Sequence, residues 1–157
     1  MSEFQEETVT QTPIKYLYFT TIDEKNFDVP FDIAKFSNYF SSFIELFDND
    51  ENEKDYIPLG QGIDSELFEH ILNFMEHYSK EPMAEIPKPI NSTNIESMVG
   101  DWYGNFISSF DEEMLMNIIN ASNFLHIQSL LDLGCAQVAI KIRHKTPDEI
   151  RDIFINK

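Results

Sequence analysis

The sequence TPDEI at residues 146–150, near the carboxyl end, carries the clearest helix start in this chain. The Thr146 hydroxyl can accept a hydrogen bond at the N-cap, and Pro147 suits the first helical position because no backbone donor is needed there. Glu149, three residues after the cap, completes a capping box. The pattern predicts a helix that begins here and ends at about Phe154 or Ile155.

This predicted helix is short and has one apolar stripe, formed by Ile150, Ile153 and Phe154 at positions i, i+3 and i+4. A helix of this length is marginally stable by itself in water. We therefore expect it to pack against another part of the protein or against a partner.

The segment before it, from Ser129 to His144, is also predicted to be helical, with apolar residues on more than one side. One side can face the core. Another side can join the stripe of the last helix and form an apolar surface larger than a free protein usually exposes. This C-terminal apolar surface consists of Leu131, Cys135, Val138, Ile142, Ile150 and Phe154. Periodicity alone favours the alternative, in which the two helices pack on each other and on the core.

Three ordered stretches give this part of the chain a recognisable pattern: NASNFLHI at 120–127, LLDLGC at 130–135 and KTPDEIR at 145–151. Together they resemble the signature of the S-phase-kinase-associated adaptor family, which links F-box proteins to cullin in SCF ubiquitin ligases. Weaker similarity extends to Trp102 and to the stretch Ile57-Pro58-Leu59. Elongin C, a related adaptor, lacks the helix that Lys-Thr-Pro opens, so the F-box adaptor branch is favoured.

The resemblance implies an α+β fold: a BTB/POZ-type domain, with a small sheet and surrounding helices, followed by a C-terminal helical extension. It implies that an F-box protein binds the C-terminal apolar surface and that cullin binds elsewhere, at Asn123 and Phe124. The alternative for this pair is a helix C-cap with a core phenylalanine. Phe124 replaces the usual tyrosine and His126 the usual aspartate, which can weaken cullin docking. Family members continue with an acidic segment and another helix where this sequence closes, so we expect either that this copy is truncated or that its F-box surface is smaller and weaker.

The expected domain organisation has three parts. Residues 1–12 are expected to be a disordered N-terminus, and residues 13–128 a BTB/POZ-like domain with a flexible insertion at 79–99. Residues 129–157 are expected to be the shortened F-box-binding helices. Within the domain we predict a β-hairpin formed by residues 14–20 and 27–29, and a third strand at 56–59. We predict a charged loop at 48–55. We also predict four helices, which begin at residues 33, 38, 65 and 112. Asp64 and Asp111 are the expected N-caps of the last two helices.

Composition limits the possible functions. The 157 residues carry 11 basic and 28 acidic side chains, a net charge of −17, which argues against nucleic acid and anionic membranes as partners. The charge is uneven, because residues 1–125 have a net charge of −18 and residues 126–157 one of +1. The single Cys135 cannot form an internal disulfide, and no apolar N-terminal run predicts a signal peptide or membrane span. We expect the protein to be cytoplasmic and nuclear.

Signals for catalysis are weak. With 5 glycines the sequence has no Gly-rich phosphate loop, and it has no clustered cysteine and histidine pattern and no nucleophile elbow. His70 and His77 share a helix face, but solvated or partly buried histidines explain them better than a metal site. We therefore predict no catalytic residue, no cofactor and no metal. The predicted function is a noncatalytic adaptor between F-box protein and cullin; the alternative is a divergent paralogue that acts as a structural or self-associating protein, with a possible homodimer.

Overall fold

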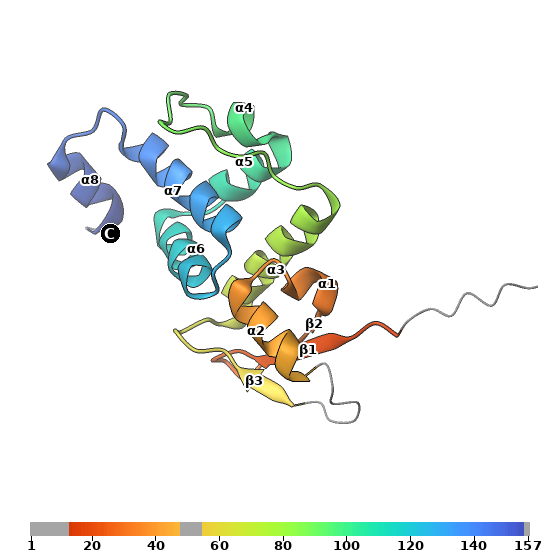
Figure 1. Ribbon diagram of the computed structural model, residues 1–157. Helices are drawn as coiled ribbons and strands as arrows, with labels where there is room; N and C mark the ends of the chain where they lie inside the picture. The colour runs from red at the N-terminus through yellow and green to blue at the C-terminus, as the bar shows by residue number, and fades with distance from the viewer. Residues whose placement is uncertain (1–12, 48–54, 156–157) are drawn as a thin grey trace, which may run out of the picture.

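The computed structural model describes residues 13–47 and 55–155. The predicted disordered N-terminus, 1–12, and nearly all of the predicted charged loop, 48–55, lie outside these residues. The described part contains a three-stranded sheet and eight helices (Figure 1). Their bounds are β1 Tyr16–Thr20, β2 Asn26–Pro30, α1 Phe31–Ala34, α2 Asn38–Phe47, β3 Tyr56–Pro58, α3 Ser65–Lys80, α4 Ile95–Val99, α5 Asp101–Ser108, α6 Glu112–Phe124, α7 Gln128–Ile142 and α8 Pro147–Phe154.

The sheet has the strand order β2-β1-β3. β1 and β2 form the predicted antiparallel hairpin, and β3 pairs with β1 in parallel, with Phe19 opposite Ile57. Leu17 and Phe19 of β1 are buried, whereas Tyr16 and Tyr18 point to the other face, as the two-residue period of a strand requires. The sheet thus has one face toward the core.

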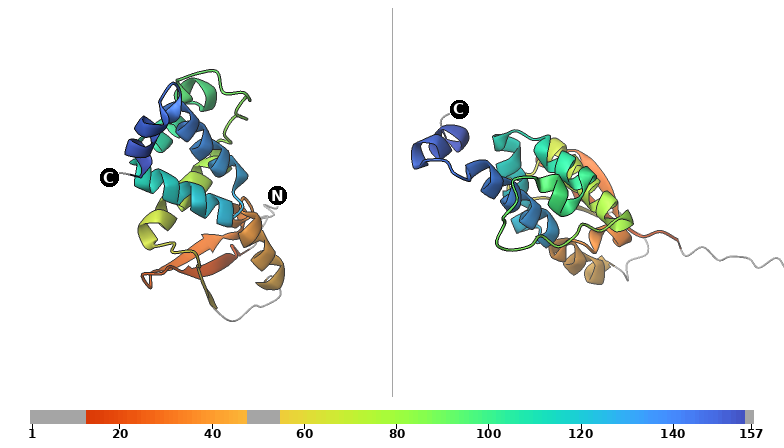
Figure 2. Two further views of the ribbon diagram at one scale, coloured as in Figure 1. Left: turned by 90° about the vertical axis from the view of Figure 1, so that its left-hand side faces the viewer. Right: turned by 90° about the horizontal axis from the view of Figure 1, so that it is seen from above.

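Aromatic rings form the centre of the core between the sheet, α2 and α3. The Phe19 ring centroid lies 4.4 Å from that of Phe40 and 6.2 Å from that of Phe68, and all three side chains are fully buried. Offset and edge-to-face arrangements of this kind add stability beyond the area that the rings bury. The helices lie to one side of the sheet, with α8 at the far end from it (Figures 1 and 2).

The predicted N-caps are confirmed at α3 and α6. The Asp64 carboxylate accepts a hydrogen bond from the Leu67 N–H at 2.9 Å, and the Asp111 carboxylate accepts one from the Met114 N–H at 2.8 Å. α3 extends to Lys80, and its buried side includes Phe74.

The predicted insertion at 79–99 contains ordered structure that the sequence did not indicate. Asn94 caps α4 by accepting a hydrogen bond from the Ser97 N–H, and Ile86, Ile95 and Val99 are buried in the core. The insertion is also attached at its start, where the Tyr103 hydroxyl donates a hydrogen bond to the Glu81 carbonyl. The prolines of this segment led us to predict a flexible loop, so its short helix was missed. The cap of that helix satisfies a backbone N–H group of its first turn.

α6 and α7 pack against each other at close range. A Cβ atom on Gly134 would lie 2.6 Å from Cγ1 of Ile119, so this position favours glycine. The inner side of α7 carries Leu130, Leu133, Gly134, Ala136 and Gln137, all buried. Within the described residues, no helix has the length and apolar character needed to cross a membrane.

Candidate protein-docking surfaces

α8 begins with the predicted capping box. The Thr146 hydroxyl accepts a hydrogen bond from the Glu149 N–H at 3.2 Å, and the Glu149 carboxylate accepts one from the Thr146 N–H at 3.3 Å. Although Ile150, Ile153 and Phe154 form its apolar stripe, no residue of α8 is buried. Local hydrogen bonds thus fix the start of the helix, while its apolar stripe is only half-buried.

The outward side of α7 carries the first four residues of the C-terminal apolar surface. Cys135 is exposed, and Leu131, Val138 and Ile142 are half-buried. Val138 also packs against the core, so it serves both sides of the helix. The alternative, in which α7 and α8 pack on each other and on the core, describes part of this arrangement, because Val138 packs against the core and α8 packs against α6 at the end of the molecule (Figures 1 and 2).

The structure places Ile150 and Phe154 half-buried on α8, beyond the end of α7. Ile153, between them, lines an open hollow of about 440 Å³ together with Ile140 of α7. The two groups of predicted residues thus lie on consecutive helices joined by residues 143–146, without a close pairing of α7 with α8.

The surroundings of the Cys135 thiol favour its uncharged, protonated form. Although Cys135 is exposed as a residue, partial desolvation of its thiol raises the pKa, the Asp132 carboxylate raises it further, and the Lys88 ammonium acts in the opposite direction. A raised pKa keeps the thiol protonated at neutral pH, so Cys135 behaves as a small apolar side chain with low nucleophilicity.

Asn123 and Phe124 lie at the end of α6 and line one open cavity of about 510 Å³, with Gln61, Gly62, Asp64, Leu67, Met114, Asn117, Asn120 and Ala121. Asn123 is exposed, and Phe124 is half-buried and packs against the core. The Phe124 ring centroid lies 4.9 Å from that of Tyr39 in α2. Leu125 is the C-cap, so the alternative of a C-cap beside a core phenylalanine describes part of this geometry.

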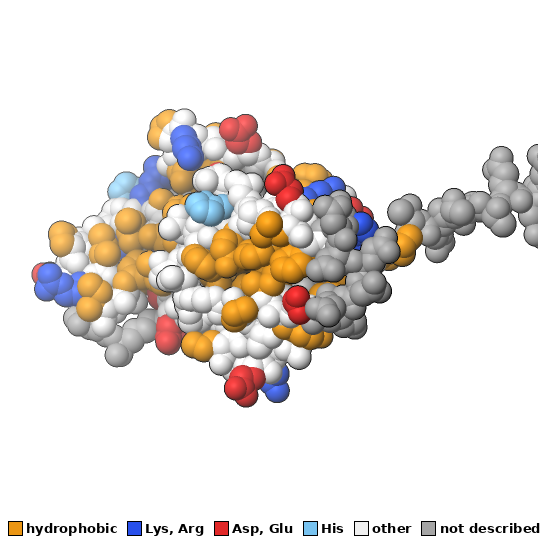
Figure 3. Space-filling model, turned by 60° about the horizontal axis from the view of Figure 1, so that its bottom comes forward, with side chains coloured by type: hydrophobic (Ala, Val, Ile, Leu, Met, Phe, Trp, Pro, Cys, Tyr) orange, Lys and Arg blue, Asp and Glu red, His pale blue; other side chains and the backbone are white. Residues whose placement is uncertain are grey.

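Apolar side chains gather in two groups on the face shown in Figure 3, one over the C-terminal helices and one over α2 and β3. α2 carries a row of three half-buried rings: Tyr39 and Phe43 meet edge-to-face with centroids 5.1 Å apart, and Phe43 and Phe47 stack with centroids 6.4 Å apart. Because Tyr39 contacts Phe124, this row adjoins the end of α6.

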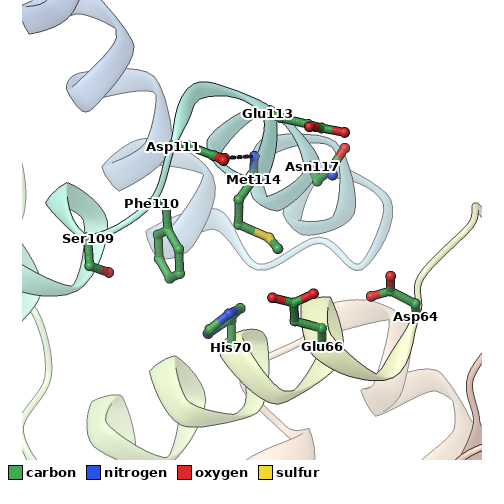
Figure 4. A pocket seen from close by; sticks show the side chains of 9 residues that line it. All are labelled: Asp64, Glu66, His70, Ser109, Phe110, Asp111, Glu113, Met114 and Asn117. Carbon is green, nitrogen blue, oxygen red and sulfur yellow. Dashed lines mark hydrogen bonds between the residues drawn. The ribbon is translucent and has the colours of Figure 1, made fainter.

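A further open cavity, of about 540 Å³, lies between α3 and the start of α6 (Figure 4). Its lining includes carboxylates of Asp64, Glu66, Asp111 and Glu113, and His70 packs its ring edge-on against Phe110 at 4.7 Å. His77 stacks in parallel on Trp102 at 3.8 Å. Among the residues that the structure describes, no three histidine, cysteine or acidic side chains are grouped so that they could hold a metal ion.

Two family models match this chain: the Skp1 family tetramerisation domain over residues 15–80 and the Skp1 family dimerisation domain over residues 128–155. An S-phase kinase-associated protein 1 homolog from Tetrahymena thermophila is 36% identical over 143 residues, 91% of this chain and 81% of that protein. The chain belongs to the Skp1 family. Two other relatives are 33% identical: the E3 ubiquitin ligase complex SCF subunit sconC of Emericella nidulans (89% of this chain, 83% of that protein) and the SCF ubiquitin ligase complex protein SKP1a of Dictyostelium discoideum (84% and 78%).

Family membership confirms the resemblance on which the fold expectation depended. Residues 15–80 of this Skp1-family chain contain the sheet and α1–α3, which together form the POZ-type unit, and residues 128–155 cover α7 and α8. The α+β class with a C-terminal helical extension is thereby established.

Sequence reasoning missed the residues that border the predicted sites. Ile140 and Ile153 line the hollow at the α7–α8 junction, and Tyr39 supports Phe124 from a helix more than 80 positions earlier in the chain. Ile153 carried a signal, because it belongs to the apolar stripe of α8. Tyr39 carried none, since its contact with α6 depends on the tertiary fold.

Proposed function

We propose that this Skp1-family chain is a noncatalytic adaptor that bridges an F-box protein to a cullin in an SCF-type ubiquitin ligase. The proposal rests on family membership, on relatives named as SCF subunits, and on one observation in the structure: α8 is well capped, yet none of its residues is buried. A helix with an accessible apolar stripe gains stability when a partner covers that stripe.

The proposed F-box surface consists of the C-terminal apolar surface defined above. Burying it removes apolar area from water at about 25 cal/mol per Å² and needs no covalent chemistry. The low charge of this region favours it further, because residues 126–157 have a net charge of +1, whereas residues 1–125 have one of −18. A partner helix can therefore approach without strong repulsion when it carries acidic groups.

The proposed cullin surface is the cavity lined by Asn123 and Phe124. Asn123 offers an exposed amide, and Phe124 offers a ring held against Tyr39. Such an arrangement of an aromatic anchor beside a polar group is typical of protein interfaces. We place adaptor function in the cytoplasm and nucleus, in line with the single cysteine of the chain.

Co-purification tests the proposal. The chain should form a 1:1 complex with a recombinant F-box motif, and that complex should then capture the N-terminal domain of a cullin. Failure to bind the F-box motif, with the chain folded, would overturn the adaptor function.

The second candidate is a structural or self-associating protein of the same fold. The matching family models, which are described as dimerisation and tetramerisation domains, favour it. This function predicts concentration-dependent assembly in sedimentation experiments, with neither F-box nor cullin binding. The net charge of −17 opposes close association of two copies at low ionic strength.

A further inference from the structure

The hollow at the junction of α6, α7 and α8 has a charge opposite to that of the molecule as a whole. Besides Ile140 and Ile153 it is lined by Glu112, Lys141, Arg143 and Lys145. Its volume of about 440 Å³ is large enough for a side chain of a partner protein. We call it the junction hollow.

The charges in the junction hollow do not cancel. The Lys141 ammonium lies 3.4 Å from the Glu112 carboxylate, so these two groups offset each other. The Arg143 guanidinium donates a hydrogen bond to the Asn91 carbonyl oxygen at 2.8 Å, which is a neutral partner. In the described part of the chain, neither Arg143 nor Lys145 has a carboxylate within ion-pair distance. Two positive charges thus remain on a chain of net charge −17.

The junction hollow lies on the same two helices as the proposed F-box surface, since Ile140 and Lys141 of α7 and Ile153 of α8 line it. Arg143 follows Ile142 directly in the chain, and Ile153 lies between Ile150 and Phe154 on α8. A helix that covers these apolar residues therefore brings its end, or a flanking residue, to the hollow. A partner that covers Ile140 and Ile153 would exclude water from the hollow, which strengthens an interaction between opposite charges.

We propose that the junction hollow binds an acidic side chain of the F-box protein that docks on the C-terminal apolar surface. This inference rests on the proposed adaptor function and adds a chemical requirement for the partner. Arg143 is the expected anchor, because a guanidinium can hold a carboxylate through two parallel hydrogen bonds and its contact with Asn91 already fixes its position. A second copy of this chain fits less well, since two chains of net charge −17 repel each other.

The test uses the full chain and a recombinant F-box motif in two versions, one unchanged and one with its aspartates and glutamates replaced by the corresponding amides. Calorimetry at low and high salt measures both affinities. We expect the unchanged motif to bind roughly tenfold more tightly at low salt, since hydrogen bonds to charged groups are the stronger ones. Arg143→Glu and Lys145→Glu should remove this preference.

Lys25→Glu is the matched control, because it changes the net charge equally but lies in the turn between β1 and β2. Lys145→Glu keeps the test valid if Arg143→Glu disturbs the segment around Asn91, because the Lys145 side chain is exposed. Equal affinity for the two motifs in the wild-type chain would overturn the inference and leave the adaptor function standing. Absence of binding to both would overturn the adaptor function itself. A salt-sensitive dimer that Arg143→Glu dissociates would assign the hollow to a second copy and contradict the inference.

Discussion

The hydroxyl of Ser37 donates a hydrogen bond to the carbonyl oxygen of Leu125 at 2.6 Å, across 88 positions of sequence. The same hydroxyl accepts a hydrogen bond from the Phe40 N–H at 3.1 Å and so caps the first turn of α2. Ser37 is fully buried. One side chain therefore joins α2 to the end of α6, directly after Asn123 and Phe124.

We predict that Ser37→Ala lowers the free energy of unfolding by about 1–3 kcal/mol, because it removes a helix cap and a buried hydrogen bond together. Denaturant unfolding measures the change. Ser42→Ala is the control: its exposed hydroxyl donates a hydrogen bond to the Tyr39 carbonyl one turn earlier in the same helix, so its substitution should change stability by less. Equal effects of the two substitutions would show that the contact with Leu125 contributes little.

Gly104 allows α5 to approach α4 closely. A Cβ atom at this position would lie 2.8 Å from the Cα atom of Glu96, and backbone cannot move aside as a flexible side chain can. Gly104→Ala should destabilise the protein, because overpacking costs about 1–3 kcal/mol whereas the gain in helix propensity is about 1 kcal/mol. Gly60→Ala, where the nearest atom is 4.0 Å away, should leave the melting temperature nearly unchanged. A raised melting temperature for Gly104→Ala would contradict this packing.

Local signals predicted much of the fold. The caps at Asp64, Asp111 and Thr146 each depend on hydrogen bonds within three residues, so the sequence contains all the information needed. The hairpin and α2 followed in the same way from alternation and from helical spacing. The α+β class then came from the resemblance, which family membership confirms.

Non-local features could not be predicted in this way. The parallel pairing of β3 with β1, the bond from Ser37 to Leu125 and the contact of α8 with α6 each join distant parts of the chain. α4 was missed because a helix of five residues, in a segment whose earlier part contains several prolines, is too short to show a clear periodicity. At the candidate sites, the binding role of the apolar residues on α7 and α8 stays a prediction, whereas the charged junction hollow could be found only from the tertiary structure.

Asp23 makes the stability of the folded protein decrease at acidic pH. Hydrogen bonds from Ser65, and then from Thr21, lower the pKa of its carboxyl group from 3.8 to about 2. Because the folded-state pKa is the lower one, this group contributes stability above about pH 4, and the contribution is lost as the pH falls toward 2. Asp23→Asn should reduce the slope of melting temperature against pH in this window. An unchanged slope would show that other carboxylates control acid unfolding.

A charged substitution on the C-terminal apolar surface should leave the free protein folded but weaken its binding to the F-box motif. We predict that Ile150→Asp and Cys135→Glu each weaken F-box binding at least about tenfold, because the complex would bury an unpaired charge. Ile22→Asp, at a side chain that is 62% exposed near the β1–β2 turn, is the control and should bind normally. Circular dichroism checks the fold of each variant. Unfolding of the Ile150→Asp chain would show that this residue belongs to the core.

We propose that two separate surfaces of one chain bind two partners. The most direct measurement is calorimetric titration of the wild-type chain, Ile150→Asp and Asn123→Lys, each with the F-box motif and with the N-terminal domain of cullin. The two-surface proposal predicts that Ile150→Asp loses only F-box binding and that Asn123→Lys loses only cullin binding. Loss of both partners in either variant, with the fold intact, would contradict it.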